Sequence, residues 1–169
     1  MQQLNSLIQE TGMKTILLMV GRTVEPHFVA GINDYVARVK RYLTFDTEVI
    51  PELKNTRNLP AEVQKEREGE LILKALQPGD VVVLLDEGGR EMRSVEFADY
   101  MRQKMNTVAR RLVFVIGGPY GFSQKVYGAA HEKLSLSRMT FSHQMVRLVF
   151  VEQLYRAMSI LHGSPYHHE

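Results

Sequence analysis

A histidine and an arginine, His143 and Arg147, stand four residues apart at the start of the last apolar segment of the chain. Histidine has an ordinary pKa near neutrality, so His143 could accept a proton from a substrate. The start of a helix disfavours the protonated ring, which would keep His143 available as a general base. Arg147 would lie on the same helix face and could hold a phosphate or a developing anion. The alternatives are a helix-capping histidine and an arginine in a surface or interface salt bridge.

An apolar run at residues 112–116 ends at the sequence Gly117-Gly118-Pro119-Tyr120-Gly121. Glycines at a strand end let the backbone approach a ligand closely, so these residues predict a small-molecule pocket or, alternatively, only a tight turn. Their spacing does not match the dinucleotide fingerprint, and the sequence contains no G-x-x-x-x-G-K-[ST] string. The motif therefore supports neither NAD nor a nucleoside triphosphate.

The elements that must position these residues follow from hydrophobic spacing. Strands are expected at residues 15–20, 46–51, 81–85, 112–116 and 134–137, and helices at 27–43, 62–76, 94–106, 123–132 and from about 143 onward. This alternation predicts a single α/β domain with a mostly parallel sheet and helices on both faces. Ligands of such sheets bind beyond the carboxyl ends of the strands, which places a pocket after residues 85, 116 and 137.

Composition narrows the class of protein. The 169 residues suit one domain, assigned here to residues 13–169, and residues 1–12 are expected to be a disordered N-terminal extension. The absence of cysteine excludes disulfides, thiolate chemistry and cysteine-ligated zinc. We expect no metal site, no membrane span and no signal peptide, hence a cytoplasmic protein. A net charge of +2 does not by itself indicate nucleic-acid binding.

Longer motifs carry a resemblance that extends from Met13 to the end of the chain. They are VIGGPYG at residues 115–121, LSLSRMTFSHQMVR at 134–147, EQLYRA at 152–157, and Pro165-Tyr166-His167. These motifs resemble the large-subunit ribosomal RNA methyltransferase H family, which belongs to the SPOUT superfamily of α/β-knot methyltransferases. One departure is Ser142, where the family usually has proline before the histidine.

The resemblance implies a C-terminal trefoil knot, a homodimer and S-adenosylmethionine bound in a bent form. The cofactor positions it implies are Leu85, Gly117, Leu136, Ser137, Arg138, Met139, Thr140 and Phe141. In the family a Pro-Tyr-His ending closes on the active site, so Tyr166 and His167 are expected to touch the substrate, together with Tyr155 and Arg138. The implied product is N3-methylpseudouridine in the helix 69 loop of 23S ribosomal RNA, made on the assembled 70S ribosome.

That reaction gives His143 and Arg147 their expected roles. The imide of a pseudouridine has a pKa of roughly 9, so its ionisation at pH 7 costs about 3 kcal/mol.

The last helix is apolar almost all round, which a dimer interface would explain. Basic residues gather late in the chain and favour an RNA surface, whereas Arg38, Lys40 and Arg41 form a separate, solvated group. The rival readings are a non-catalytic ribosome-assembly protein and a related knotted methyltransferase with another RNA target.

Overall fold

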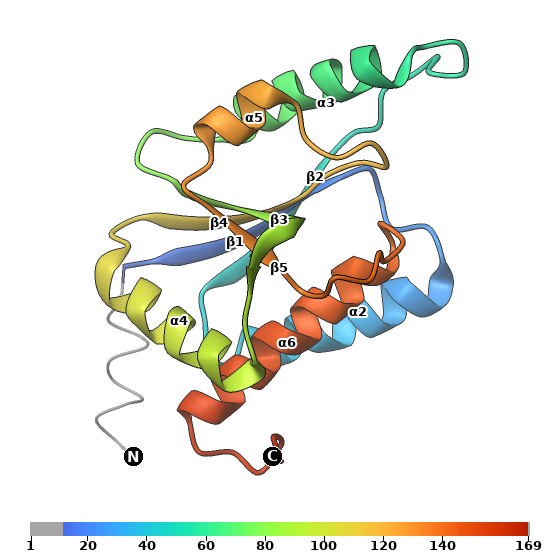
Figure 1. The fold of residues 1–169 in the computed structure, drawn as a ribbon. Helices are drawn as coiled ribbons and strands as arrows, with labels where there is room; N and C mark the ends of the chain where they lie inside the picture. Colours follow the sequence, from blue (N-terminus) through green and yellow to red (C-terminus); the bar gives the residue numbers. More distant parts are fainter. Residues whose placement is uncertain (1–11, 169) are drawn as a thin grey trace.

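Five strands form one sheet in the order β2-β1-β4-β3-β5, and every neighbouring pair is parallel (Figure 1). This computed structural model describes residues 12–168, so the expected extension at residues 1–12 lies, apart from Gly12, outside the described residues. The strands are β1 (Lys14–Val20), β2 (Phe45–Ile50), β3 (Val81–Glu91), β4 (Arg111–Ile116) and β5 (Glu132–Ser135). The predicted parallel α/β architecture is confirmed.

Helices cover both faces of the sheet, as predicted. They are α2 (Pro26–Val39), α3 (Ala61–Ala75), α4 (Ser94–Thr107), α5 (Gln124–Ala129) and α6 (Met145–Leu161). In Figure 1, α3 and α5 lie on one face, and α2, α4 and α6 lie on the other. The short β5 and the N-terminus of α6 bring the last third of the chain to the carboxyl edge of the sheet.

The core has two halves because the central strands are buried on both faces. In β1, Leu17 packs into the cluster shared with α2, α4 and α6, whereas Ile16 and Leu18 pack into the cluster shared with α3 and α5. Phe114 and Val113 of β4 divide in the same way. Side chains alternate between the faces of a strand, so a strand covered on both sides is a continuous apolar run. This is why the runs at 81–85 and 112–116 indicated central strands.

The third strand is longer than predicted. It was expected to end at Leu85, but β3 continues to Glu91 and pairs with β5 on both sides of an irregularity, so that Leu85 and Arg90 both align with Leu134. A Cβ at Gly89 would lie only 2.6–2.8 Å from the backbone of Lys133 and Leu134. The backbones of β3 and β5 therefore approach so closely here that no side chain fits between them. A glycine in a strand pattern can mark such an approach. The trefoil knot that the resemblance implies stays a prediction.

Other helix and strand boundaries differ from the predicted ones because of local hydrogen bonds. The helix expected at 123–132 ends at Ala129 because His131 is already extended beside β3: its N–H donates to the Val82 carbonyl at 2.9 Å, and its ring Nδ1 accepts from the Val82 N–H at 3.0 Å. The following strand is therefore Glu132–Ser135 rather than 134–137. The helix expected at 27–43 ends at Val39, because residues 40–43 form a turn bonded back to Val36, Arg38 and Val39.

The last helix, α6, lies between α2 and α4 and against the sheet (Figure 1). Its fully buried side chains include Phe150, Val151, Leu154 and Met158. Packing within one chain therefore accounts for much of the apolar character that a dimer interface was expected to explain. The apolar character of α6 is therefore not evidence for a homodimer.

Candidate cofactor pocket and catalytic surface

A cavity of about 660 Å³ opens beside residues 85–87 of β3 and at the carboxyl ends of β4 and β5, a size typical of small-molecule sites. Three segments line it: residues 85–87 within β3, residues 116–122 after β4, and most of residues 136–143 between β5 and α6. We call residues 117–121 the glycine loop and residues 136–144 the β5–α6 loop. The predicted location of the pocket is confirmed for the ends of β4 and β5, whereas at β3 the pocket lies beside the strand, which continues to Glu91.

Backbone geometry shapes the glycine loop. The N–H of Gly121 donates to the carbonyl oxygen of Gly118 at 3.2 Å, and the two residues form an isolated β-bridge. Gly121 has a φ of 77°, in the left-handed region that favours glycine. The tight turn closes directly after the buried strand, with Pro119 and Tyr120 at its tip. The turn and the pocket wall, which the sequence left as alternatives, are the same feature.

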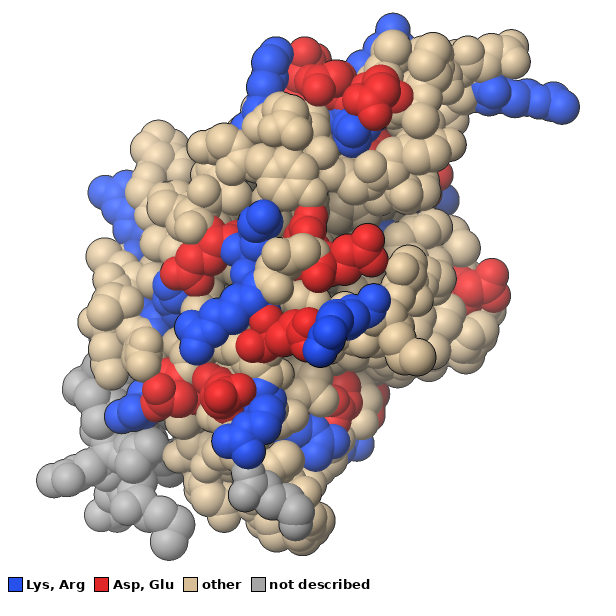
Figure 2. Space-filling view, viewed as in Figure 1, with Lys and Arg blue, Asp and Glu red and all other residues tan. Residues whose placement is uncertain are grey.

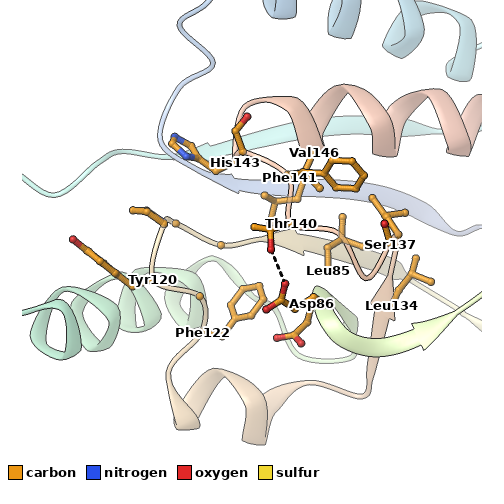
Figure 3. A pocket seen from close by; sticks show the side chains of 18 of the residues that line it. Leu85, Asp86, Tyr120, Phe122, Leu134, Ser137, Thr140, Phe141, His143 and Val146 are labelled. Carbon is orange, nitrogen blue, oxygen red and sulfur yellow. Dashed lines mark hydrogen bonds between the residues drawn. The ribbon is translucent and has the colours of Figure 1, made fainter.

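Two carboxyl groups from β3 face the cavity. Asp86 accepts a hydrogen bond from the Gly88 N–H at 2.8 Å and a second from the hydroxyl of Tyr127 on α5. Burial, followed by the bond and charge of Asp86, raises the pKa of Tyr127 to about 12, so the hydroxyl remains a donor at neutral pH. Glu87 accepts from the Thr140 hydroxyl at 3.2 Å, the dashed line of Figure 3. This bond joins β3 to the β5–α6 loop across the cavity.

The β5–α6 loop holds its own shape through serine side chains. The hydroxyl of Ser137 accepts from the Met139 N–H at 2.9 Å, and the hydroxyl of Ser135 donates to the Ser137 carbonyl at 3.0 Å. Such local bonds let serine replace regular secondary structure. At the end of the loop, the Ser142 hydroxyl accepts from the Met145 N–H at 3.1 Å, so the serine that replaces the family's proline caps the turn into α6.

Seven of the eight predicted cofactor positions line this cavity, as Figure 3 shows for several of them. They are Leu85, Gly117, Leu136, Ser137, Met139, Thr140 and Phe141. The eighth, Arg138, does not line it: its side chain is 85% exposed and pairs with Glu91 at 3.0 Å. Among residues 136–143 of the loop, Arg138 is thus the exception that faces solvent.

The donor set suits an adenosyl cofactor with a positively charged sulfur. Leu85, Leu136 and Phe141 supply apolar walls for an adenine, and the exposed backbone of the glycine loop can supply N–H and C=O groups. The carboxyl groups of Asp86 and Glu87 give the cavity negative charge, which complements a sulfonium or an ammonium group. The residues present therefore fit such a group.

His143 lies at the mouth of the cavity with an exposed side chain. It was expected within the first turn of the last helix, but it stands in the turn just ahead of α6, which begins at Met145. The first helical bond, from the Val146 N–H to the Ser142 carbonyl at 3.0 Å, spans this position. The imidazole thus borders both the pocket and solvent, where an RNA base could reach it.

Arg147 has a different environment from the one expected. Its side chain is fully buried and donates to four of the protein's own acceptors. These are the carbonyls of His143 (3.0 Å), Gly21 (2.8 Å) and Val20 (2.7 Å) and the hydroxyl of Thr23 (3.0 Å). Burial lowers the pKa of the Arg147 guanidinium, and the charge of Glu52 offsets this in part. The structure therefore gives this guanidinium no access to a phosphate or a substrate anion.

The predicted substrate-contacting residues of the tail lie at the other end of α6. Ten residues separate Met145 from Tyr155, which corresponds to about 15 Å along a helix. Tyr166 donates to Glu152 at 3.0 Å, its oxygen lies 3.1 Å from that of Tyr35, and its ring contacts the Tyr155 ring edge-on with centroids 4.7 Å apart. Burial, with these two bonds, raises the pKa of Tyr166. Neither Tyr155, Tyr166 nor His167 lines the cavity of its own chain.

Basic side chains join this tail cluster. Arg156 pairs with Glu152, lies over the Tyr166 ring at 4.9 Å and approaches His167 Nδ1 at 3.3 Å. Arg38 lies over both Tyr35 and Tyr155. Arg38, from the group at 38–41 that was expected to be solvated, thus contacts α6 through Tyr155, because α2 packs along α6, while its side chain stays 38% exposed and pairs with Asp34.

Sequence reasoning missed several residues of the cavity wall. Phe122, Tyr127 and Val146 line it although none was proposed as a site residue. Phe122 directly follows the glycine loop, which was a usable signal, but nothing in the local pattern connects Tyr127 with Asp86. Within residues 12–168, no group of His, Asp and Glu side chains has the arrangement of a metal site, and no helix has the length and hydropathy to cross a membrane.

Comparison with known proteins supplies the family. Residues 13–167 match the family model described as a predicted SPOUT methyltransferase. The chain is 74% identical to the ribosomal RNA large subunit methyltransferase H of Bacteroides thetaiotaomicron, over 93% of this chain and the whole of that protein. The proteins of the same name from Bacteroides fragilis and Porphyromonas gingivalis are 71% and 52% identical over the same shares.

A solved structure shares the fold at much lower identity. The crystal structure of a probable methyltransferase from Bordetella pertussis superposes with a TM-score of 0.52 at 12% identity, over 94% of this chain and 99% of that one. Cavity, motifs and relatives agree, and the chain belongs to the SPOUT methyltransferases, within the ribosomal RNA large subunit methyltransferase H family.

Proposed function

We propose that this protein uses S-adenosylmethionine to methylate N3 of a pseudouridine in the helix 69 loop of 23S ribosomal RNA on the assembled 70S ribosome. The observation that carries the proposal is the cavity between β3 and the carboxyl ends of β4 and β5, with the exposed imidazole of His143 at its mouth. The names of the close relatives support a substrate in large-subunit ribosomal RNA. The resemblance of the C-terminal motifs is the basis for the nucleotide and the atom.

The cavity would hold the methyl donor. Leu85, Leu136, Met139 and Phe141 would contact its apolar parts, and Gly117, Ser137 and Thr140 would offer backbone and hydroxyl groups. When bound, the donor supplies a methyl group on a positively charged sulfur, activated for transfer. The protein then has to orient the acceptor nitrogen and remove its proton, since positioning is a large part of such catalysis.

His143 is the proposed general base. It borders the cavity and solvent, so a base that enters the mouth can present its N3–H to an imidazole nitrogen. The proton would move to the ring, and the electron pair left on N3 would form the bond to the methyl carbon as the carbon–sulfur bond breaks and its electrons stay on sulfur, which becomes a neutral thioether. The ring would later return the proton to water. Proton removal by a positioned side chain contributes about 10²–10⁴-fold in rate.

Arg147 would act as a positioning residue in this scheme. It donates to the carbonyl of His143 itself and to the carbonyls at the end of β1. The guanidinium thereby fixes the turn that carries the imidazole relative to the sheet. A base held within a fraction of an ångström by such bonds keeps its geometry through the reaction.

The tail supports a homodimer as part of the proposal. Tyr155, Tyr166 and His167 do not line the cavity of their own chain, and Tyr155 lies about 15 Å along α6 from its start, so in this proposal they contact the substrate in the cavity of a second copy. An extended C-terminus on one protomer would then complete the site of the other. The exposed Arg138 and Met139, the latter 78% exposed, would face that partner or the RNA.

A dimer would also compensate for the small net positive charge of one chain in RNA binding. On the face viewed in Figure 2, lysine and arginine side chains alternate with aspartate and glutamate, in line with a net charge of +2. Affinity for RNA depends strongly on the number of phosphates neutralised. Recognition of a formed ribosomal surface by two chains, in the cytoplasm where ribosomes assemble, fits this charge better than capture of free RNA.

The test is methyl transfer from tritium-labelled S-adenosylmethionine to ribosomes of a strain that lacks this protein. We expect counts on 70S particles, few on free 50S subunits, and N3-methylpseudouridine on nucleoside mass spectrometry. A different methylated nucleoside would favour a related knotted methyltransferase. The absence of counts on either particle, with no thermal stabilisation by S-adenosylhomocysteine, would leave a non-catalytic ribosome-assembly protein.

A further inference from the structure

A buried glutamate behind the glycine loop has no role in the site described above. Glu68 belongs to α3, a helix rich in exposed charge, yet it is only 4% exposed. Its Oε1 accepts a hydrogen bond from the amide of Gln64, one turn earlier, at 3.0 Å. Its Oε2 has no hydrogen-bond partner among the residues that the structure describes. Buried polar atoms without partners are rare, and each calls for an explanation.

The neighbour of this carboxyl group is Gly118. A Cβ built on Gly118 would lie 3.0 Å from Cδ and 3.1 Å from Oε1 of Glu68, and would overlap with Oε2. The carboxyl group is thus pressed against the backbone of the glycine loop, which also lines the cavity. The absence of a side chain at Gly118 makes this approach possible. The unshared oxygen therefore faces the segment that would contact the methyl donor.

We propose that Glu68 is a positioning residue for cofactor binding, whose carboxyl group supports the glycine loop from behind. Contact with the Gly118 backbone limits how far the loop can move away from the cavity. The unshared Oε2 provides an acceptor for a loop N–H when the loop closes on a ligand. Gln64 fixes the orientation of the carboxyl group, and α3 supplies the rigid base.

The inference rests on the proposed binding of S-adenosylmethionine, but its first test needs no cofactor. Hydrogen–deuterium exchange of the ligand-free protein would compare the amides of residues 117–121 in the wild type and in Glu68→Ala. We expect exchange in the loop to rise roughly tenfold while β4 stays protected, as for a local opening. The matched control is Glu70→Ala, an exposed glutamate two residues along the same helix, which should leave the loop unchanged.

The second test measures S-adenosylhomocysteine affinity by calorimetry. Glu68→Ala should raise Kd roughly tenfold, because binding must then also order the loop. Glu68→Gln, which keeps the shape and one acceptor, should retain most of the wild-type affinity. Gly118→Ala should also weaken binding, and less so in the Glu68→Ala background, where the methyl group has room. Unchanged loop exchange in Glu68→Ala, or equal affinity of wild type and Glu68→Ala, overturns the inference. A wild type that binds no S-adenosylhomocysteine refutes the proposed cofactor instead, and loop exchange still decides the role of Glu68.

Discussion

The two ends of α6 carry arginines in opposite situations. Arg147, beside the cavity, is fully buried and donates to three carbonyls and a hydroxyl of its own chain. Arg156, at the tail, is partly exposed and contacts the side chains of Glu152, Tyr166 and His167. The first arginine fixes backbone, whereas the second belongs to a network of side chains that can rearrange. The cavity end is therefore built for a fixed geometry and the tail end for an adaptable contact.

Removal of the buried guanidinium should show the largest difference between the two ends. Arg147→Ala leaves the carbonyls of Val20 and Gly21 without their donor, and we expect a loss of about 3 kcal/mol or more in the free energy of unfolding. Arg156→Ala is the matched control on the same helix, with an expected loss of about 1 kcal/mol or less. Urea denaturation measures both. Equal losses would contradict the contrast drawn between the two arginines.

His143→Ala tests the cavity end without touching its framework. The exposed imidazole contributes little packing, so the free energy of unfolding should change by only about 0.5 kcal/mol. Methyl transfer to 70S ribosomes should fall about 10²-fold or more, while S-adenosylhomocysteine binding stays near the wild-type value. Single-turnover counts and calorimetry give these two quantities. A variant with full activity would remove His143 from the role of base.

The tail can be tested by its separation from the cavity. Tyr166→Phe removes the hydrogen bonds to Glu152 and Tyr35 but keeps the ring. We expect cofactor affinity to be unchanged and methyl transfer to fall roughly tenfold, the loss of about one hydrogen bond to the substrate. Mixing this variant with His143→Ala should restore part of the activity if the tail acts in a second copy. Loss of cofactor affinity in Tyr166→Phe would instead indicate that the tail and the cavity form one binding site.

The smallest effect concerns pH. Folding raises the pKa of Tyr127 from its ordinary value of 10.0 to about 12, through burial and the neighbouring Asp86. As pH rises, the unfolded chain therefore loses this proton first. The contribution of Tyr127 to the free energy of unfolding is complete below pH 10 and is lost as pH rises toward 12. Tyr127→Phe should cost about 1 kcal/mol at neutral pH, and its stability should fall less steeply above pH 10 than that of the wild type. Parallel curves would show that folding does not raise the pKa of Tyr127.

Local pattern was enough to find the elements and the pocket. Continuous apolar runs indicated β3 and β4, and the turn residues after them indicated the carboxyl edge where the cavity lies. For these features the information lies within a few neighbouring residues, which is why the local pattern could provide it. The seven lining positions came instead from the resemblance of the longer motifs to a known family.

The errors arose where distant segments meet. Arg147 was expected to hold a phosphate or a developing anion, or to form a surface or interface salt bridge, although its spacing from Phe150, Val151 and Leu154 puts it on the buried face of α6. Its partners, at the end of β1, are far away in the sequence and leave no local signal. The burial of Glu68 was missed for a similar reason, since its contact is with the glycine loop fifty residues later. Charge alone is a poor guide to exposure when the backbone of another element supplies the partners.

The bonds of Arg147 also set an order of events during synthesis. The carbonyl of Val20 and its donor are 127 positions apart, so the first strand emerges from the ribosome long before the group that completes its end has been made. Contacts of such high sequence separation form late and slow folding. A nascent chain that stops short of α6 is thus expected to remain protease-sensitive at this edge of the sheet. The turn that carries His143 is therefore joined to the first strand only after α6 has been made.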